Sequence, residues 1–191
     1  HRGRVGNTFV FNISFPSVSD LNHQANRGIY ALFYLDSNNW IAAGISGDPF
    51  GAIRNALLYM SGGILNASSS GPVGTVTDGD TITVKVSVES DRITVRNSVN
   101  GFNSSRSMLY SKGNITDISQ YMVGVMCHLN PCNIHNITYT PSISYSDDFA
   151  TDTTGRYQAV RGTVTYDDVN KRLNVTTETG ANGKASGRLK S

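Results

Sequence analysis

The residues best suited to covalent chemistry are two cysteines in one short segment. Cys127 and Cys132 lie in the sequence CHLNPC, and such a pair closes a small loop if its Cα atoms come within about 7 Å. The alternatives are a metal site that includes His128 and His135, or two reduced thiols. A Cys-x4-Cys pair followed by a lone His matches no common zinc spacing. We therefore expect a disulfide, which is typical of an oxidising compartment, and no metal site.

Six asparagines stand in the acceptor sequence for N-linked glycans, Asn-x-Ser/Thr. They are Asn12, Asn66, Asn103, Asn114, Asn136 and Asn174. The 18 Asn and 39 Ser or Thr residues of the chain predict about 3.7 such triplets by chance, so the number is a mild excess. In a bacterial or phage protein these triplets would have no meaning, and this remains an alternative.

The placement of the acceptor sites favours glycosylation more than their number does. Asn12, Asn136 and Asn174 alternate with large apolar residues, so strand periodicity should turn them outward when their neighbours face the core. Asn66 and the other two are expected in turns rich in Gly and Ser. We predict an extracellular or cell-surface chain that carries N-glycans and no cofactor.

The carboxylates and histidines do not form a catalytic set. Jelly-roll glucanases carry Glu-x-Asp-x-Glu on one strand, because acid and nucleophile must face each other across one sugar bond. This chain has only Glu89 and Glu178, far apart. Neither His23 nor the two histidines near the cysteines accompanies a nucleophile elbow. We expect no catalytic residues and no enzyme activity.

A carbohydrate-binding site is the alternative function. Three aromatic residues could stack on a sugar, and two acidic pairs could hold calcium through oxygen ligands: Trp40, Tyr30 and Tyr34, and Asp78 with Asp80 or Asp147 with Asp148. However, Trp40 alternates with Ile41 within a strand pattern, which is more typical of a core residue. Paired Asp residues are also common in turns, so calcium is a weak expectation.

Short alternating segments separated by turn residues must position these groups. Apolar residues recur with a period of two from Phe9 to Phe15. Further strands are expected at 29–35, 39–45, 81–88, 92–96, 121–126, 134–139, 162–166 and 173–177. The segment Ala52–Met60 is interpreted as strand, turn and strand with the residues that follow it. Nineteen glycines punctuate the pattern, which predicts an all-β, two-sheet antiparallel sandwich.

Length and charge limit the partners. A chain of 191 residues is long enough for one large sandwich core. The net charge is +2, with 16% charged residues, which excludes recognition of nucleic acid or of an anionic membrane by bulk charge. No stretch approaches the roughly 20 apolar residues of a membrane span.

A family resemblance follows from three segments. They are GIYALFYLDSNNWIAAGI, DGDTITVKVSVESDRITVRNSVNG, and YMVGVMC followed by NIHNITY. This pattern resembles the concanavalin A-like or laminin-G-like jelly roll over about Thr8–Tyr139. The resemblance implies a strand that returns beside the first. The DDF sequence at Asp147 resembles the opening of such domains, but here it stands near the carboxyl end.

The displaced opening divides the chain into a sandwich body (1–140), a linker (141–146) stiffened by Pro141, and a terminal hairpin segment (147–191). The segment could fold back as a circular permutation, or it could complete the sheet of a neighbouring copy. The expected donor is Tyr157–Thr177, and the expected acceptor is the apolar groove beside Phe9–Phe15.

The energy of burying the donor residues is comparable to the cost of association, so exchange between copies is a possible alternative. The donor residues are Val160, Val164, Tyr166, Leu173 and Val175. Their burial would contribute about 1.5–3 kcal/mol each, against an association cost of about 4–15 kcal/mol. A head-to-tail contact of this kind gives rings or open filaments. We therefore expect a structural subunit whose partners are other copies of itself, with a monomeric lectin-like module of an adhesion protein as the alternative.

Overall fold

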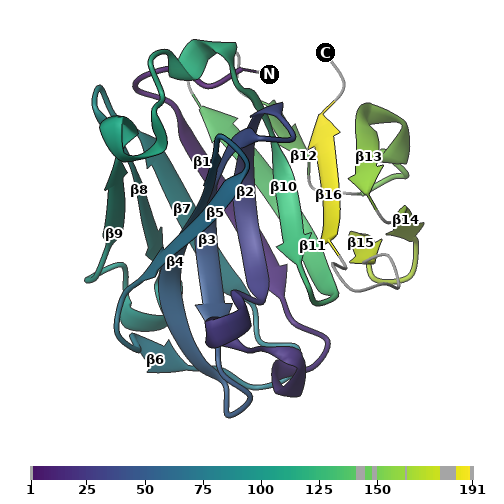
Figure 1. Cartoon of the computed structure of the whole chain (residues 1–191). Helices are drawn as coiled ribbons and strands as arrows, with labels where there is room; N and C mark the ends of the chain where they lie inside the picture. The colour runs from purple at the N-terminus through teal and green to yellow at the C-terminus, as the bar shows by residue number, and fades with distance from the viewer. Residues whose placement is uncertain (1, 141–144, 148–149, 162, 177–183, 190–191) are drawn as a thin grey trace.

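The computed structural model describes residues 2–140, 145–147, 150–161, 163–176 and 184–189. Two antiparallel sheets face each other and form a β-sandwich, as the sequence predicts (Figure 1). The helical turns of the described residues are short 3-10 segments. None of them is long and apolar enough to cross a membrane.

The first sheet, sheet A, has eight strands in the order β13-β16-β10-β2-β3-β4-β5, with β6 paired to β4. Their bounds are β13 (Tyr157–Arg161), β16 (Lys184–Leu189), β10 (Met122–His128), β2 (Gly28–Asp36), β3 (Asn39–Gly47), β4 (Ala52–Ser61), β5 (Ile64–Ser69) and β6 (Gly74–Thr75). The β4–β5 hairpin confirms the strand, turn and strand predicted from Ala52 onward.

The second sheet, sheet B, also has eight strands, in the order β14-β15-β11-β1-β7-β8-β9, with β12 paired to β11. Their bounds are β14 (Thr163–Asp167), β15 (Arg172–Thr176), β11 (Cys132–Thr140), β1 (Thr8–Ser14), β7 (Ile82–Val88), β8 (Arg92–Asn97), β9 (Arg106–Leu109) and β12 (Tyr145–Asp147). The final body strand β11 lies beside β1, as the jelly-roll resemblance implies.

Alternation builds the core. Phe9, Phe11 and Ile13 of β1 are buried between the sheets, while Val10 and Asn12 are half-buried on the outer side. The neighbouring strand β7 adds Val84, and the facing sheet A adds Phe33 and Ile41 to one continuous cluster. This burial of apolar surface is the main term that holds the two sheets together.

A β-bulge in β11 shifts the alternation of inward-facing and outward-facing side chains by one residue. Ile134 and Ile137 are both buried, although they are three residues apart. The register against β1 shifts at this point, because Ile13 pairs with Ile134 and Asn12 pairs with Asn136, leaving His135 without a register partner in β1. The extra residue lets both isoleucines face the core.

The terminal segment of this single chain completes both of its own sheets. Strand β15 pairs with β11, and β16 pairs with β10. Figure 1 shows the four terminal strands gathered on one side of the body. The linker expected at 141–146 overlaps with β12, which pairs with β11, and residues 141–144 lie outside the described residues.

Candidate strand-acceptor site

The edges of two body strands form the site at which the terminal segment docks. Strand β10 is the last body strand of sheet A, and β11 is the last long body strand of sheet B. Without the terminal strands, β10 and the Cys132–Ile134 part of β11 would present unpaired backbone N–H and C=O groups, which readily accept another strand; the Ile137–Tyr139 part of β11 pairs with β12. The acceptor expected beside Phe9–Phe15 is not the backbone edge of β1, because β1 is paired on both sides, with β11 and with β7. Phe9 and Phe11 instead line the apolar space that Tyr157 of the terminal segment also lines.

The terminal strands carry apolar side chains into the space between these edges. Leu173 and Val175 of β15 are buried, with exposed fractions of 1% and 5%, and Tyr157 at the start of β13 is also buried. Val164 and Tyr166 of β14 are partly buried against the same cluster. Four of the five predicted donor residues therefore contact the core. Val160 lies in β13, and its side chain is outside the described part.

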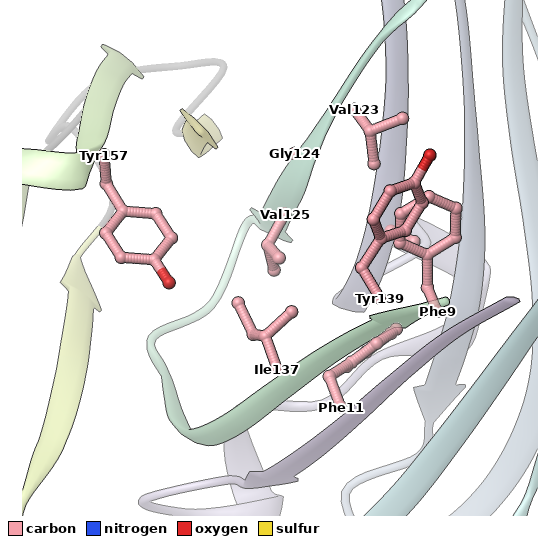
Figure 2. A pocket seen from close by; sticks show the side chains of 9 residues that line it. Phe9, Phe11, Val123, Gly124, Val125, Ile137, Tyr139 and Tyr157 are labelled. Atoms are coloured by element: carbon pink, nitrogen blue, oxygen red, sulfur yellow. The ribbon is translucent and has the colours of Figure 1, made fainter. Parts of the chain in front are cut away.

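The seam, where the terminal strands meet β10 and β11, is incompletely packed. Two small apolar voids, of about 20 and 10 Å³, lie where the terminal strands meet the body. Figure 2 shows Tyr157 pointing from the terminal segment toward Val125 and Ile137, with Phe11 and Tyr139 on the far side. Atoms that line a void lose dispersion contacts on one side, so the seam is packed less tightly than a continuous core.

A buried aromatic group forms the body side of the seam. The rings of Phe9 and Tyr139 stack with centroids 4.5 Å apart, and Phe9 meets Phe33 edge to face at 5.5 Å. The Tyr139 hydroxyl accepts a hydrogen bond from the Asn7 amide and donates to the carbonyl oxygen of Arg2 at 3.0 Å. Burial raises the pKa of Tyr139. The amino-terminal residues thus fix the wall against which the terminal strands pack.

The predicted disulfide is present and joins the two acceptor edges. Cys127 is the second-last residue of β10 and Cys132 is the first residue of β11. Their Cα atoms are 6.2 Å apart. Both residues are buried. Because β10 and β11 belong to different sheets, the bond ties sheet A to sheet B at the edge where the terminal strands dock. No cluster of three or more metal-ligating side chains occurs in the described residues.

The outer side of the seam carries a pH-sensitive contact. The His135 Nε2 lies 2.9 Å from Ser14 Oγ, next to strand β15. Burial lowers the pKa of His135, and the positive charge of Arg172 in β15 lowers it further. Arg172 itself pairs with Asp167 at 3.1 Å. Protonation of His135 would therefore place a second positive charge beside the docked strand.

Three of the predicted glycosylation sites lie on the outer side of sheet B. Asn12 and Asn136 are register partners across β1 and β11. Thr83 donates a hydrogen bond to the Asn12 Oδ1 at 2.8 Å, and Thr138 donates to the Asn136 Oδ1 at 3.1 Å. Asn174 is also half-buried, but its Oδ1 is buried without a hydrogen-bond partner in the described structure.

The other three sites differ in their surroundings. Asn103 and Asn114 are exposed in loops, and Asn114 adopts a left-handed backbone conformation (φ 53°). Asn66, by contrast, lies within strand β5 rather than in a turn. The side-chain amides of Asn66, Asn103 and Asn114 donate hydrogen bonds to Ile64, Asn100 and Ser61.

The residues considered for sugar stacking are mostly core residues. Trp40 is 6% exposed and Tyr30 is fully buried, and burial raises the pKa of Tyr30. They pack with Tyr34 in a second apolar cluster on sheet A. Trp40 and Tyr30 therefore offer no open platform.

The carboxylates of the acidic pair Asp78 and Asp80 accept hydrogen bonds from neighbouring loop residues. Asp78 accepts a hydrogen bond from the backbone N–H of Val18 at 2.7 Å, and Asp80 accepts two from Thr77. These Thr77 bonds lower the pKa of Asp80. Asp148 and Glu178 lie outside the described residues, as does the side chain of Asp147.

Sequence reasoning missed β16, the terminal strand that pairs with β10 in sheet A. Strand β16 lies beyond the predicted donor segment, in a region rich in Gly and Lys. Its segment KASGRL lacks the alternation of large apolar residues that marks the other strands. Tyr157 was named only as a boundary, although its ring fills the middle of the seam.

Comparison with known proteins identifies the architecture alone. No family model matches the chain, and no curated protein matches it. A xylan β-1,4-xylosidase from Bacillus halodurans C-125 is similar in structure, with a TM-score of 0.50 and 8% identity over 72% of this chain. The protein BlXynB from Bacillus licheniformis matches 64% of the chain at 12% identity and a TM-score of 0.40.

These matches span only about a quarter of the other proteins, 28% and 24% of their chains. At 8% identity the likeness to the xylosidase concerns the fold. It supports the two-sheet antiparallel arrangement and gives no information about the activity of this chain.

A substitution in β15 tests whether the terminal strands are part of the cooperative core. Leu173→Ala should lower the free energy of unfolding by about 2–5 kcal/mol, because it leaves a cavity beside Ile134. Val169→Ala, at a side chain that is 89% exposed, should change it by less than about 0.5 kcal/mol. Urea unfolding of the oxidised chain measures both. Equal midpoints for the two variants would contradict this packing.

The contact of His135 predicts a loss of stability in acid. Because the folded state holds its pKa below the ordinary value of about 6.5, the unfolded chain binds more protons as the pH falls through that value. Stability should therefore decrease below about pH 6.5. His135→Gln should flatten this part of the pH dependence in urea unfolding. An unchanged slope in the variant would assign the effect to other groups.

Proposed function

We propose that this chain is a structural subunit of an extracellular, N-glycosylated filament or surface fibre, assembled head to tail. The terminal strands of one copy would complete the sandwich of the next. The observation that carries the proposal is that one contiguous segment completes both sheets at once, through β15 on β11 and β16 on β10. In the single chain these pairs form within the chain, and the assembly would form the same pairs between copies.

Exchange of the same contacts is physically inexpensive. A swapped segment makes in its neighbour the contacts that it makes at home, so no new interface has to be created. Burial of Leu173, Val175 and Tyr157 contributes about 1.5–3 kcal/mol for each side chain. Backbone hydrogen bonds along two edges add to this sum. Because the closed chain makes the same contacts, they cancel in the exchange, and the concentration of the chain must offset the association cost of about 4–15 kcal/mol.

A single connection joins the body to the terminal strands, and its length limits how far these strands can reach. Strand β12 ends at Asp147 and β13 begins at Tyr157, so residues 148–156 join them. Nine residues span at most about 30 Å when extended, and the 3-10 turn Thr154–Arg156 within them would have to open to give that reach. Because β12 pairs with β11 of the body, the crossing to a neighbour would begin after β12.

Such a contact is heterologous, because the donor strands of one copy meet the acceptor edges of another. Contacts of this kind close into rings or continue as filaments. The order of the elements supports a concanavalin A-like jelly roll whose opening strands stand at the carboxyl end. In this arrangement every subunit both gives and receives a segment.

Glycans would occupy a face that the strand exchange leaves free. Asn12 and Asn136 lie on the outer side of sheet B, away from the inner surfaces that the terminal strands cover. Asn103 and Asn114 are exposed in loops. The buried disulfide fits the oxidising compartment in which N-glycosylated proteins fold.

Engineered cysteines distinguish exchange between copies from folding back. Asn133 and Asn174 are Cα partners across β11 and β15. We expect Asn133→Cys and Asn174→Cys chains, unfolded together and refolded after formation of the native disulfide, to form a covalent dimer on mild oxidation. Mixing Asn174→Cys with Lys85→Cys, three strands away in sheet B, is the matched control. Electrophoresis without reductant detects the products.

The opposite outcome of this experiment is equally clear. A double variant that crosslinks only within one chain, together with no dimer from the mixed single variants, would refute the exchange. Sedimentation would then give one species near 20.6 kDa at every concentration.

Intact mass tests the glycans on protein from its native source. Treatment with a peptide N-glycosidase, which removes N-linked glycans, should lower the mass and leave Asp at each occupied position. Asn103 and Asn114 should be occupied most fully because they are exposed, and Asn174 least because its Oδ1 is buried. Peptide mapping locates the Asp residues. A mass of 20.6 kDa before and after treatment would rule out the modification.

A further inference from the structure

A second opening of the sandwich lies between the other two sheet edges. Strand β5 ends sheet A and β9 ends sheet B on the side opposite the terminal strands. Figure 1 shows β9 on the side of the sandwich away from β14 and β16. A cleft of about 350 Å³ opens there. This volume is at the lower end of the range for small-molecule sites, about 300–1,000 Å³.

Two positive charges line this cleft without an acidic partner. Arg106 of β9 and Lys112 contribute to the lining. No ion pair joins a carboxylate of the described residues to either side chain, and the acidic residues Glu89 and Asp91 pair with Arg92. An anionic ligand would therefore meet two cations whose charge the fold leaves uncompensated.

The guanidinium of Arg106 is held in place from the opposite sheet. Its Nε donates to the Ser68 Oγ of β5 at 2.9 Å, and its Nη2 donates to the same oxygen. This bond bridges the cleft and fixes the plane of the guanidinium, while Nη1 makes no hydrogen bond to a described residue. A planar, fixed guanidinium is the side-chain group best suited to bind a carboxylate.

The rest of the lining suits a sugar ring. Tyr59 is half-buried at the cleft, and within the described part of the chain its hydroxyl has no hydrogen-bond partner. Leu109 and the Tyr59 ring offer apolar surface to the C–H groups of a sugar, while the Ser107 hydroxyl is hydrogen-bonded to the Thr94 hydroxyl at 2.9 Å. Aromatic surface beside a few convergent polar groups is typical of ligand sites.

We propose that the cleft between β5 and β9 binds an acidic saccharide, with the uronic acid carboxylate between Arg106 and Lys112 and a sugar face on Tyr59. This site is separate from the strand-acceptor site and does not rest on the filament proposal. It differs from the aromatic residues suggested by the sequence, because Trp40 and Tyr30 are buried.

Binding of digalacturonate, with neutral digalactose as the comparison, tests the proposal on the full-length oxidised chain. We expect chemical-shift changes in NMR spectra at residues of the cleft with the acidic sugar, weakening as salt screens the charges. Lys112→Gln should weaken binding about threefold to tenfold. Tyr59→Phe tests the hydroxyl, and Arg106→Lys, which keeps the charge but loses the fork, should weaken binding as well.

Lys85→Gln is the matched control, because Lys85 is an exposed lysine on the outer side of sheet B. It should leave the affinity unchanged. Equal binding of the neutral and the acidic disaccharide, no binding of either at millimolar concentration, or equal weakening by Lys85→Gln and Lys112→Gln would overturn the proposal. Thermal unfolding of each variant shows that a lost interaction is not a lost fold.

Discussion

The structure depends on one constraint, that the two body edges at β10 and β11 need partner strands. Both strands border the mostly apolar space between the sheets, and the Cys127–Cys132 disulfide holds them together. A bare pair of such edges would expose unpaired backbone groups and core side chains at the same place. The terminal segment meets both needs through Leu173, Val175 and Tyr157. The proposed assembly rests on this requirement.

The seam also differs from the rest of the core in quality. Two voids lie along it, and His135 faces Arg172 on its outer side. The stacked rings of Phe9 and Tyr139 line the larger of these voids on the body side. A docking surface that is apolar, incompletely packed and reached by one connection is compatible with closing in the same chain or in a neighbour. The choice between them depends on concentration and on the 148–156 connection.

The two open sides of the sandwich have opposite chemistry. The side at β10 and β11 is apolar and is completed by strands, whereas the side at β5 and β9 is polar and carries Arg106 and Lys112. Outer faces with acceptor asparagines lie between them on sheet B. In the proposed assembly, one side would join neighbouring copies and the other side would stay open to ligands.

The sequence alone determined the fold class, the disulfide and most body strands, because alternation with period two and the spacing of two cysteines are local properties. It also indicated that Trp40 is a core residue. The tertiary structure decided what depends on distant pairing. The bulge at His135 lets both Ile134 and Ile137 point into the core. Strand β16 forms because β10 offers it an unpaired edge. The edge of β1 is not an acceptor because β11 already pairs with it. The cleft at Arg106 joins residues of two sheets, and no local pattern predicts it, since only the closing of the sandwich brings Ser68 and Arg106 together.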